Sequence, residues 1–218
     1  MTVGLSVECE RERSSREEAV NALTHGLGAM AIAAGSPFLL TASFRHGGGV
    51  ALAAASVFAA TAVVLYVASA VYHAMPPGRT KCRWQALDHV AIFLLIAGTY
   101  TPFTLGVLRG PWGWSLFGIV WAAAGVGLFA ECFGFKQIRS ISLGLFLIMG
   151  WVAVVAIVPI VKHVPLHGLL WIVAGGIAYT LGTIFYAIDR IPYFHAVWHL
   201  FVLLGTSLHF VAVMNYAV

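Results

Sequence analysis

Charged residues are scarce in this chain. They make up 9% of its 218 residues, hydrophobic residues make up 61%, and the mean hydropathy is +0.92. Soluble domains carry about 25% charged residues, so this composition excludes an ordinary soluble protein. Several apolar runs approach or exceed the roughly 18 residues that cross a bilayer, which indicates an integral membrane protein.

Cysteines are also few. Cys9, Cys82 and Cys132 show no paired spacing and no CxxC motif, so the sequence supports neither a disulfide framework nor a thiolate zinc knuckle, and we expect free thiols. The chain has no internal repeat, low-complexity tract or heptad run that we can defend. The net charge of +4 comes from Lys and Arg spread over short loops, so we do not expect a nucleic-acid partner.

Glycine, proline and charge clusters divide the chain into seven apolar segments of similar length. We expect membrane spans at residues 22–44, 51–74, 86–108, 113–134, 141–161, 167–188 and 194–216. The connections are short, including Arg45-His46-Gly47-Gly48-Gly49 between the first two spans, so consecutive helices would be antiparallel neighbours. The predicted fold is an all-α membrane protein, a seven-transmembrane helix bundle forming a single domain over residues 21–218, after a short cytoplasmic N-terminal segment, residues 1–20.

The distribution of Lys and Arg predicts the orientation. Nine of these residues lie on the side of the N-terminus and three on the opposite side, and basic loops are retained in the cytoplasm. The N-terminus would be cytoplasmic and the C-terminus outside. The first twenty residues are too acidic for a cleaved leader, so we expect the first span to be retained.

Histidines gather at the cytoplasmic ends of the expected spans. His195 and His199 are separated by about 6 Å of helical rise and about 40° of rotation, so both rings would face one point. His73 lies at the same depth on the second span. Three neutral imidazoles and a water form the open tetrahedral set of a catalytic zinc site. The alternative for the HxxxH pair is two histidines that snorkel toward the headgroups.

Asp88 and Ser69 are the candidate catalytic residues. Asp88, near the start of the third span, would be expensive to bury without a partner. It would either pair with a nearby cation, or lie beside the metal site as a general base or as an acceptor that orients a histidine. The nearby cations are Arg79, Lys81 and Arg83.

Ser69 precedes His73 by one helical turn, so its hydroxyl would contact an oxyanion or a water. The alternative is a hydrogen bond to the carbonyl four residues earlier. The chain has no Ser-His-Asp order and no strained elbow, which argues against a nucleophile.

Other polar residues give weaker signals. Glu18, Asn21 and His25 form one stripe of a helix and would either cap the cavity or lie at the membrane interface. His209 lies about 15 Å along the helix from His199, so we expect it to be a hydrogen-bonded packing residue. Glu131 would pair with Lys136 or Arg139, and His89 would be an interfacial histidine.

Several of these motifs occur together in a known family. Glu18-x-x-Asn21-x-x-Thr24-His25 is followed by Ser69-x-x-x-His73, by Asp88 with Ile96-Ala97-Gly98-Thr99-Tyr100-Thr101-Pro102-Phe103, and by His195-x-x-x-His199. From Glu18 to His209 the chain resembles bacterial hemolysin III proteins, within the progestin and adipoQ receptor (PAQR) family and its alkaline ceramidase relatives.

The resemblance implies a zinc ion (Zn²⁺) near the cytoplasmic leaflet, with His73, His195 and His199 as ligands. Ser69 and Asp88 would lie around the metal-bound water. It also implies a multi-pass protein of the bacterial inner (plasma) membrane that hydrolyses a lipid amide or ester, as ceramidases do. The receptors of the family have a long cytoplasmic N-terminal region that this chain does not show, so hormone binding is not expected.

Two other functions stay open. The chain could be a non-enzymatic membrane sensor or regulator of membrane homeostasis, in which zinc is structural. It could also be a pore-forming cytolysin, which only the family name supports. A membrane lipid is the expected substrate or ligand, and the formation of a homo-oligomer is left open.

Overall fold

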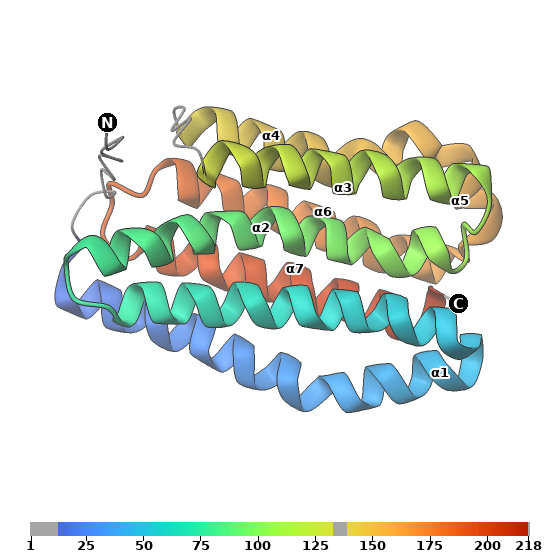
Figure 1. The fold of residues 1–218 in the computed structure, drawn as a ribbon, viewed down its shortest axis with the longest axis horizontal. Helices are drawn as coiled ribbons and strands as arrows, with labels where there is room; N and C mark the ends of the chain where they lie inside the picture. The colour runs from blue at the N-terminus through green and yellow to red at the C-terminus, as the bar shows by residue number, and fades with distance from the viewer. Residues whose placement is uncertain (1–12, 133–138, 218) are drawn as a thin grey trace, which may run out of the picture.

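The computed structural model describes residues 13–132 and 139–217, and all its regular elements in these ranges are helices. They run lengthwise in an elongated bundle (Figure 1). The elements are α1 (Ser15–Ala74), α2 (Arg79–Leu105), α3 (Pro111–Cys132), α4 (Arg139–Trp151), the 3₁₀ helix η1 (Val152–Ala156), α5 (Ile157–His163), α6 (Leu166–Ala187) and α7 (Phe194–Tyr216).

Six candidate membrane spans are present in the described ranges, rather than the seven expected from the sequence. The difference lies in α1, a 60-residue element that covers both of the first two expected spans. Gly48 interrupts it with a φ of 65° and a ψ of −152°, a conformation that glycine adopts without strain. The expected loop is therefore reduced to a sharp turn.

The two arms of α1 run side by side in opposite directions, blue and cyan in Figure 1. Their contact is close where Gly28 of the first arm faces Tyr66 of the second. A Cβ atom at Gly28 would lie 2.9 Å from Cδ1 of Tyr66. The fold-back brings Glu18, at the start of α1, to His73, at its end.

The fifth expected span, residues 141–161, is not one regular helix. It comprises α4, η1 and α5, although Ser142–His163 as a whole is long and apolar enough to cross a membrane. The hydroxyl of Tyr100 inserts at the break: it donates to the carbonyl of Gly150 at 2.8 Å and accepts from the N–H of Ala153 at 3.2 Å. A side chain that inserts into the helical ladder is a common cause of such a break.

Helix α2 is the central element and α4 to α5 form a peripheral wall. In the apolar 18-residue stretch of α2, 61% of residues are buried, against 17% in the corresponding stretch of Ser142–His163. Gly98 of α2 lies so close to α1 that an added Cβ atom would collide with the side chain of Thr61. Small residues permit this approach between helices, as expected for a bundle in lipid.

The expectation of free thiols is wrong for Cys82, which is disulfide-bonded. Its partner is outside the side chains that the structure describes. Spacing along the chain, on which the expectation rested, does not report distances between separate helices.

Candidate metal centre and adjoining cavity

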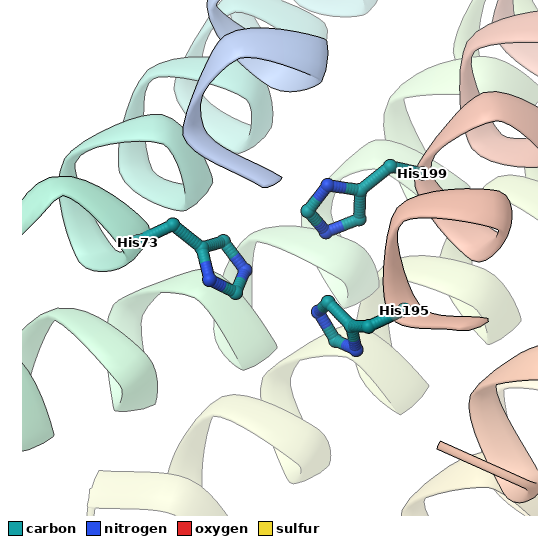
Figure 2. A group of neighbouring side chains, drawn as sticks. All are labelled: His73, His195 and His199. Carbon is teal, nitrogen blue, oxygen red and sulfur yellow. The ribbon is translucent and has the colours of Figure 1, made fainter. Parts of the chain in front are cut away.

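Three buried histidines meet at one end of the bundle. His73 is in the last turn of α1, and His195 and His199 are in the first two turns of α7. One ring nitrogen of each lies within 4.8 Å of the others, and the residues are 2%, 6% and 1% exposed. Figure 2 shows the three rings directed toward a common space. Such a group could hold a metal ion.

Glu18 orients the ring of His73. Nδ1 of His73 donates to Oε2 of Glu18 at 2.5 Å, while Lys81 contacts Oε1 of the same carboxylate at 3.0 Å. A carboxylate held by a cation accepts hydrogen bonds, so the proton of the neutral ring is on Nδ1. Nε2 of His73 is buried and has no hydrogen-bond partner in the described structure. A carboxylate–histidine pair of this kind is typical of metal sites.

Thr24 orients the ring of His199 in the same sense. Its hydroxyl donates to the carbonyl of Asn21 at 2.8 Å and lies 3.0 Å from Nδ1 of His199. Because its proton is used, Thr24 accepts the second hydrogen bond, and Nδ1 of His199 is the donor. The lone pair of this ring is therefore on Nε2.

His195 is held differently. Nη2 of Arg13 lies 3.2 Å from Nδ1 of His195 and 2.9 Å from Oδ2 of Asp189. A guanidinium only donates, so Nδ1 of His195 is an acceptor in this arrangement. If a metal bound Nε2, Nδ1 would become a donor. Arg13 would then lose its hydrogen bond to His195, but its ion pair with Asp189 could remain.

Ser69 and Asp88 line a cavity next to the three histidines. Ser69 is 0% exposed and its hydroxyl has no hydrogen-bond partner in the described part of the chain. The alternative bond to the carbonyl four residues earlier is therefore wrong, although Ser36 and Ser56 do form that bond. Asp88 is buried, and Lys81, a considered partner, instead contacts Glu18.

The stripe formed by Glu18, Asn21 and His25 lies beside the three candidate metal ligands rather than at a lipid-facing surface. His25 stacks on His199 with ring centroids 3.6 Å apart. Asn21 and His25 are 1% and 2% exposed, and none of their side-chain nitrogen and oxygen atoms has a hydrogen-bond partner in the described structure.

The remaining polar expectations have mixed outcomes. His209 is a hydrogen-bonded packing residue, as expected: Nδ1 donates to the carbonyl of Gly205 at 2.8 Å, and the ring stacks on Tyr179. Glu131 contacts His89 at 3.8 Å. The side chains of Lys136 and Arg139, its expected partners, are outside those described.

The cavity has a volume of about 250 Å³ and is mostly apolar. It begins at His25, Ser69 and His199 and extends to Leu116, Ile160 and Val164 at the other end of the bundle. Its lining on α2 runs from Asp88 to Thr104, which corresponds to roughly 24 Å of helix. The space is therefore long and narrow, with polar groups at one end.

Sequence reasoning missed Arg13, Glu17 and Asp189, which support the cluster. It named Thr24 only as part of the family motif and Lys81 only as a possible partner of Asp88, and gave neither a role at the histidines. Only Glu17 carried a local signal, because Ser14-x-x-Glu17 has the pattern of a capping box. The others contact partners far away in the chain.

The bundle and the histidine cluster define a multi-pass helical membrane protein with a buried site that could bind a metal. The chain belongs to the haemolysin-III related family, whose model matches residues 13–210.

The chain is similar to Hemolysin-3 of Bacillus cereus, with 39% identity over 92% of each chain. It is also similar to the Hemolysin-3 homolog of Bacillus subtilis (strain 168), with 37% identity over 93% of this chain and 95% of the relative. The human Monocyte to macrophage differentiation factor is 26% identical over 70% of this chain and 65% of its own length, consistent with the PAQR resemblance.

Proposed function

We propose that this protein is a zinc-dependent hydrolase that cleaves an amide or ester of a membrane lipid, as ceramidases do. The observation that carries the proposal is the position of three buried imidazoles at the polar end of a long apolar cavity. The cavity suits an acyl chain, and the histidines suit a metal at the head of that chain.

The donor set fits zinc. His73 and His199 each donate from Nδ1 to an oxygen, which leaves Nε2 for the metal, and the orphaned Nε2 of His73 supports this assignment. With His195 these are three nitrogen ligands, the number that leaves a catalytic zinc site an open position. When bound, zinc supplies Lewis-acid activation of water and of the substrate carbonyl.

Asp88 and Ser69 would carry the remaining chemistry. Asp88 takes the proton of the attacking water, because it is a buried carboxylate that lines the same end of the cavity. The hydroxyl of Ser69, which has no protein partner in the described structure, donates to the developing oxyanion. Glu18, Asn21 and His25 complete the polar end around these groups.

The proposed topology has seven crossings. The two arms of α1 each span the bilayer, which adds one crossing to the six candidate spans. The excess of Lys and Arg on the N-terminal side supports a cytoplasmic N-terminus and an outer C-terminus in the bacterial inner membrane. The histidines would then lie near the cytoplasmic leaflet.

The proposal is tested by incubating zinc-loaded protein in lipid vesicles with N-acyl amides and acyl esters and measuring released fatty acid. We expect hydrolysis by the wild type and none by Asp88→Asn, with zinc content unchanged. The control is Glu131→Gln, which alters a carboxylate that contacts His89 and none of the three candidate metal ligands in the described contacts. If the zinc-loaded wild type cleaves neither the amides nor the esters, the proposed hydrolase activity is wrong. A membrane sensor with structural zinc then explains the site better.

A further inference from the structure

Helix α7 starts without a side-chain cap of its own. Its N-cap residue, Tyr193, has a left-handed φ of 64° and makes no side-chain capping bond. The first N–H groups of a helix need acceptors, and a helix end without them frays. His195 and His199 lie in the first turns of α7, so their positions depend on what holds this end.

Glu17 of α1 supplies an acceptor from another part of the chain. Its Oε1 accepts the N–H of Tyr193 at 3.1 Å. Its Oε2 accepts the N–H and the hydroxyl of Ser14 at 3.1 and 2.9 Å, which closes the capping box of α1. One carboxylate therefore joins the N-termini of α1 and α7, where its negative charge is favourable for both helices.

Arg13 provides a second connection at the same place. It forms an ion pair with Asp189, between α6 and α7, at 2.9 Å, and the two side chains are only 2% and 7% exposed. It also lies 3.2 Å from Nδ1 of His195. Ion pairs this deeply buried hold their partners firmly, because an unpaired buried charge is strongly destabilising.

We propose that Glu17 and Arg13 are positioning residues for the candidate metal centre. By holding the start of α7 against α1, they set the distance between the HxxxH pair and His73. This inference rests on the metal centre proposed above. In this inference, residues at the start of α1 act on the metal centre indirectly, because they hold the start of α7.

Three variants separate the connection to α7 from the capping of α1. Ser14→Ala removes the capping box and leaves the bond from Tyr193 to Glu17. Glu17→Ala removes both, and Glu17→Gln keeps an oxygen that accepts from Tyr193. We would measure the zinc affinity of the full-length protein in detergent by competition with a chelator.

We expect Glu17→Ala to weaken zinc binding about tenfold, which is typical for partners that orient metal ligands. Ser14→Ala and Glu17→Gln should bind zinc like the wild type. A merely structural effect of capping would lower the affinity of Ser14→Ala and Glu17→Ala alike. That result, or full affinity in Glu17→Ala, would overturn the role of Glu17.

Arg13 is tested with the double variant Arg13→Gln/Asp189→Asn, which removes both charges of this buried ion pair. The matched control is Arg16→Gln, because Arg16 is exposed on the first turn of α1. We expect weaker zinc binding in the double variant only. Affinity equal to that of the control would overturn the role of Arg13.

Hydrogen exchange of the metal-free protein gives a second measurement that does not depend on zinc. We expect the amides of residues 193–199 to exchange faster in Glu17→Ala than in Ser14→Ala. If the wild type binds no zinc, the proposed metal centre is wrong. The exchange rates then still test whether Glu17 holds the start of α7. If zinc binds and the exchange rates are equal in both variants, the metal centre is supported, but Glu17 does not hold the start of α7.

Discussion

Nδ1 of His73 donates a hydrogen bond to Oε2 of Glu18 at 2.5 Å, and the two residues are 55 positions apart in the chain. The bond joins the two ends of α1 and turns Nε2 of His73 toward the other histidines. Lys81 contacts the other oxygen of Glu18 at 3.0 Å, which keeps the carboxylate available as an acceptor. The orientation of a candidate metal ligand is therefore set by a residue on the opposite arm of α1.

Replacing Glu18 should weaken metal binding. Glu18→Ala removes the acceptor of His73, and we expect a loss of about 10- to 100-fold in zinc affinity. The measurement is a chelator competition on purified protein. Glu131→Gln, which changes another half-buried carboxylate next to a histidine, should leave the affinity unchanged. Equal effects of the two variants would contradict the role given to Glu18.

Replacing Ser69 should separate activity from stability. Its buried hydroxyl has no hydrogen-bond partner in the described structure, so Ser69→Ala removes no protein contact of that kind. We expect an unchanged or raised melting temperature, and a loss of about 10²- to 10³-fold in lipid hydrolysis because an oxyanion donor is missing. Thermal melting and released fatty acid measure the two effects. A marked fall in melting temperature with full activity would contradict this assignment.

Replacing Tyr100 should destabilise the backbone at the break between α4 and α5. The Tyr100→Phe variant loses the bonds to the carbonyl of Gly150 and the N–H of Ala153, and we expect it to be less stable by about 1–3 kcal/mol. Hydrogen exchange at Gly150 to Ala156 should rise. Zinc affinity should stay at the wild-type value, because the break lies away from the histidines. Unchanged exchange would show that Tyr100 does not hold the break.

Enlarging Gly98 should separate α1 from α2. The Gly98→Val variant places its side chain where Thr61 lies, and overpacking of this kind typically costs about 1–3 kcal/mol. We expect a lower melting temperature. Gly125→Val is the matched control, because nothing lies within 4 Å of a Cβ at that glycine. Equal stability of the two variants would contradict the close packing of α1 on α2.

Local patterns in the sequence predicted the helices and the histidine spacing well. The apolar runs correspond to α2, α3, α6 and α7, and the HxxxH spacing places His195 and His199 in successive turns of α7. These features depend on neighbours within a few residues. The resemblance to the hemolysin III family is confirmed by the match over residues 13–210.

The remaining features depend on contacts between distant parts of the chain. Nothing near Tyr100 predicts that its hydroxyl enters the fifth span, and nothing near Arg13 predicts its ion pair with Asp189 across 176 positions. The turn at Gly48 was expected as a loop, because three consecutive glycines do not show how tightly the chain reverses. The shape of the cavity likewise follows only from the packed helices.

The zinc content of the purified protein shows whether the three histidines form a metal centre. We would determine zinc by elemental analysis of detergent-purified protein for the wild type, His199→Ala and His209→Ala, with thermal stability recorded for each. His209 is the control, because it is a buried histidine of the same helix whose Nδ1 bonds the carbonyl of Gly205. We expect about one zinc per chain in the wild type and in His209→Ala, and none in a folded His199→Ala. A folded wild type that holds no zinc after supplementation, or a His199→Ala variant that keeps its zinc, would show that these histidines do not form a zinc site.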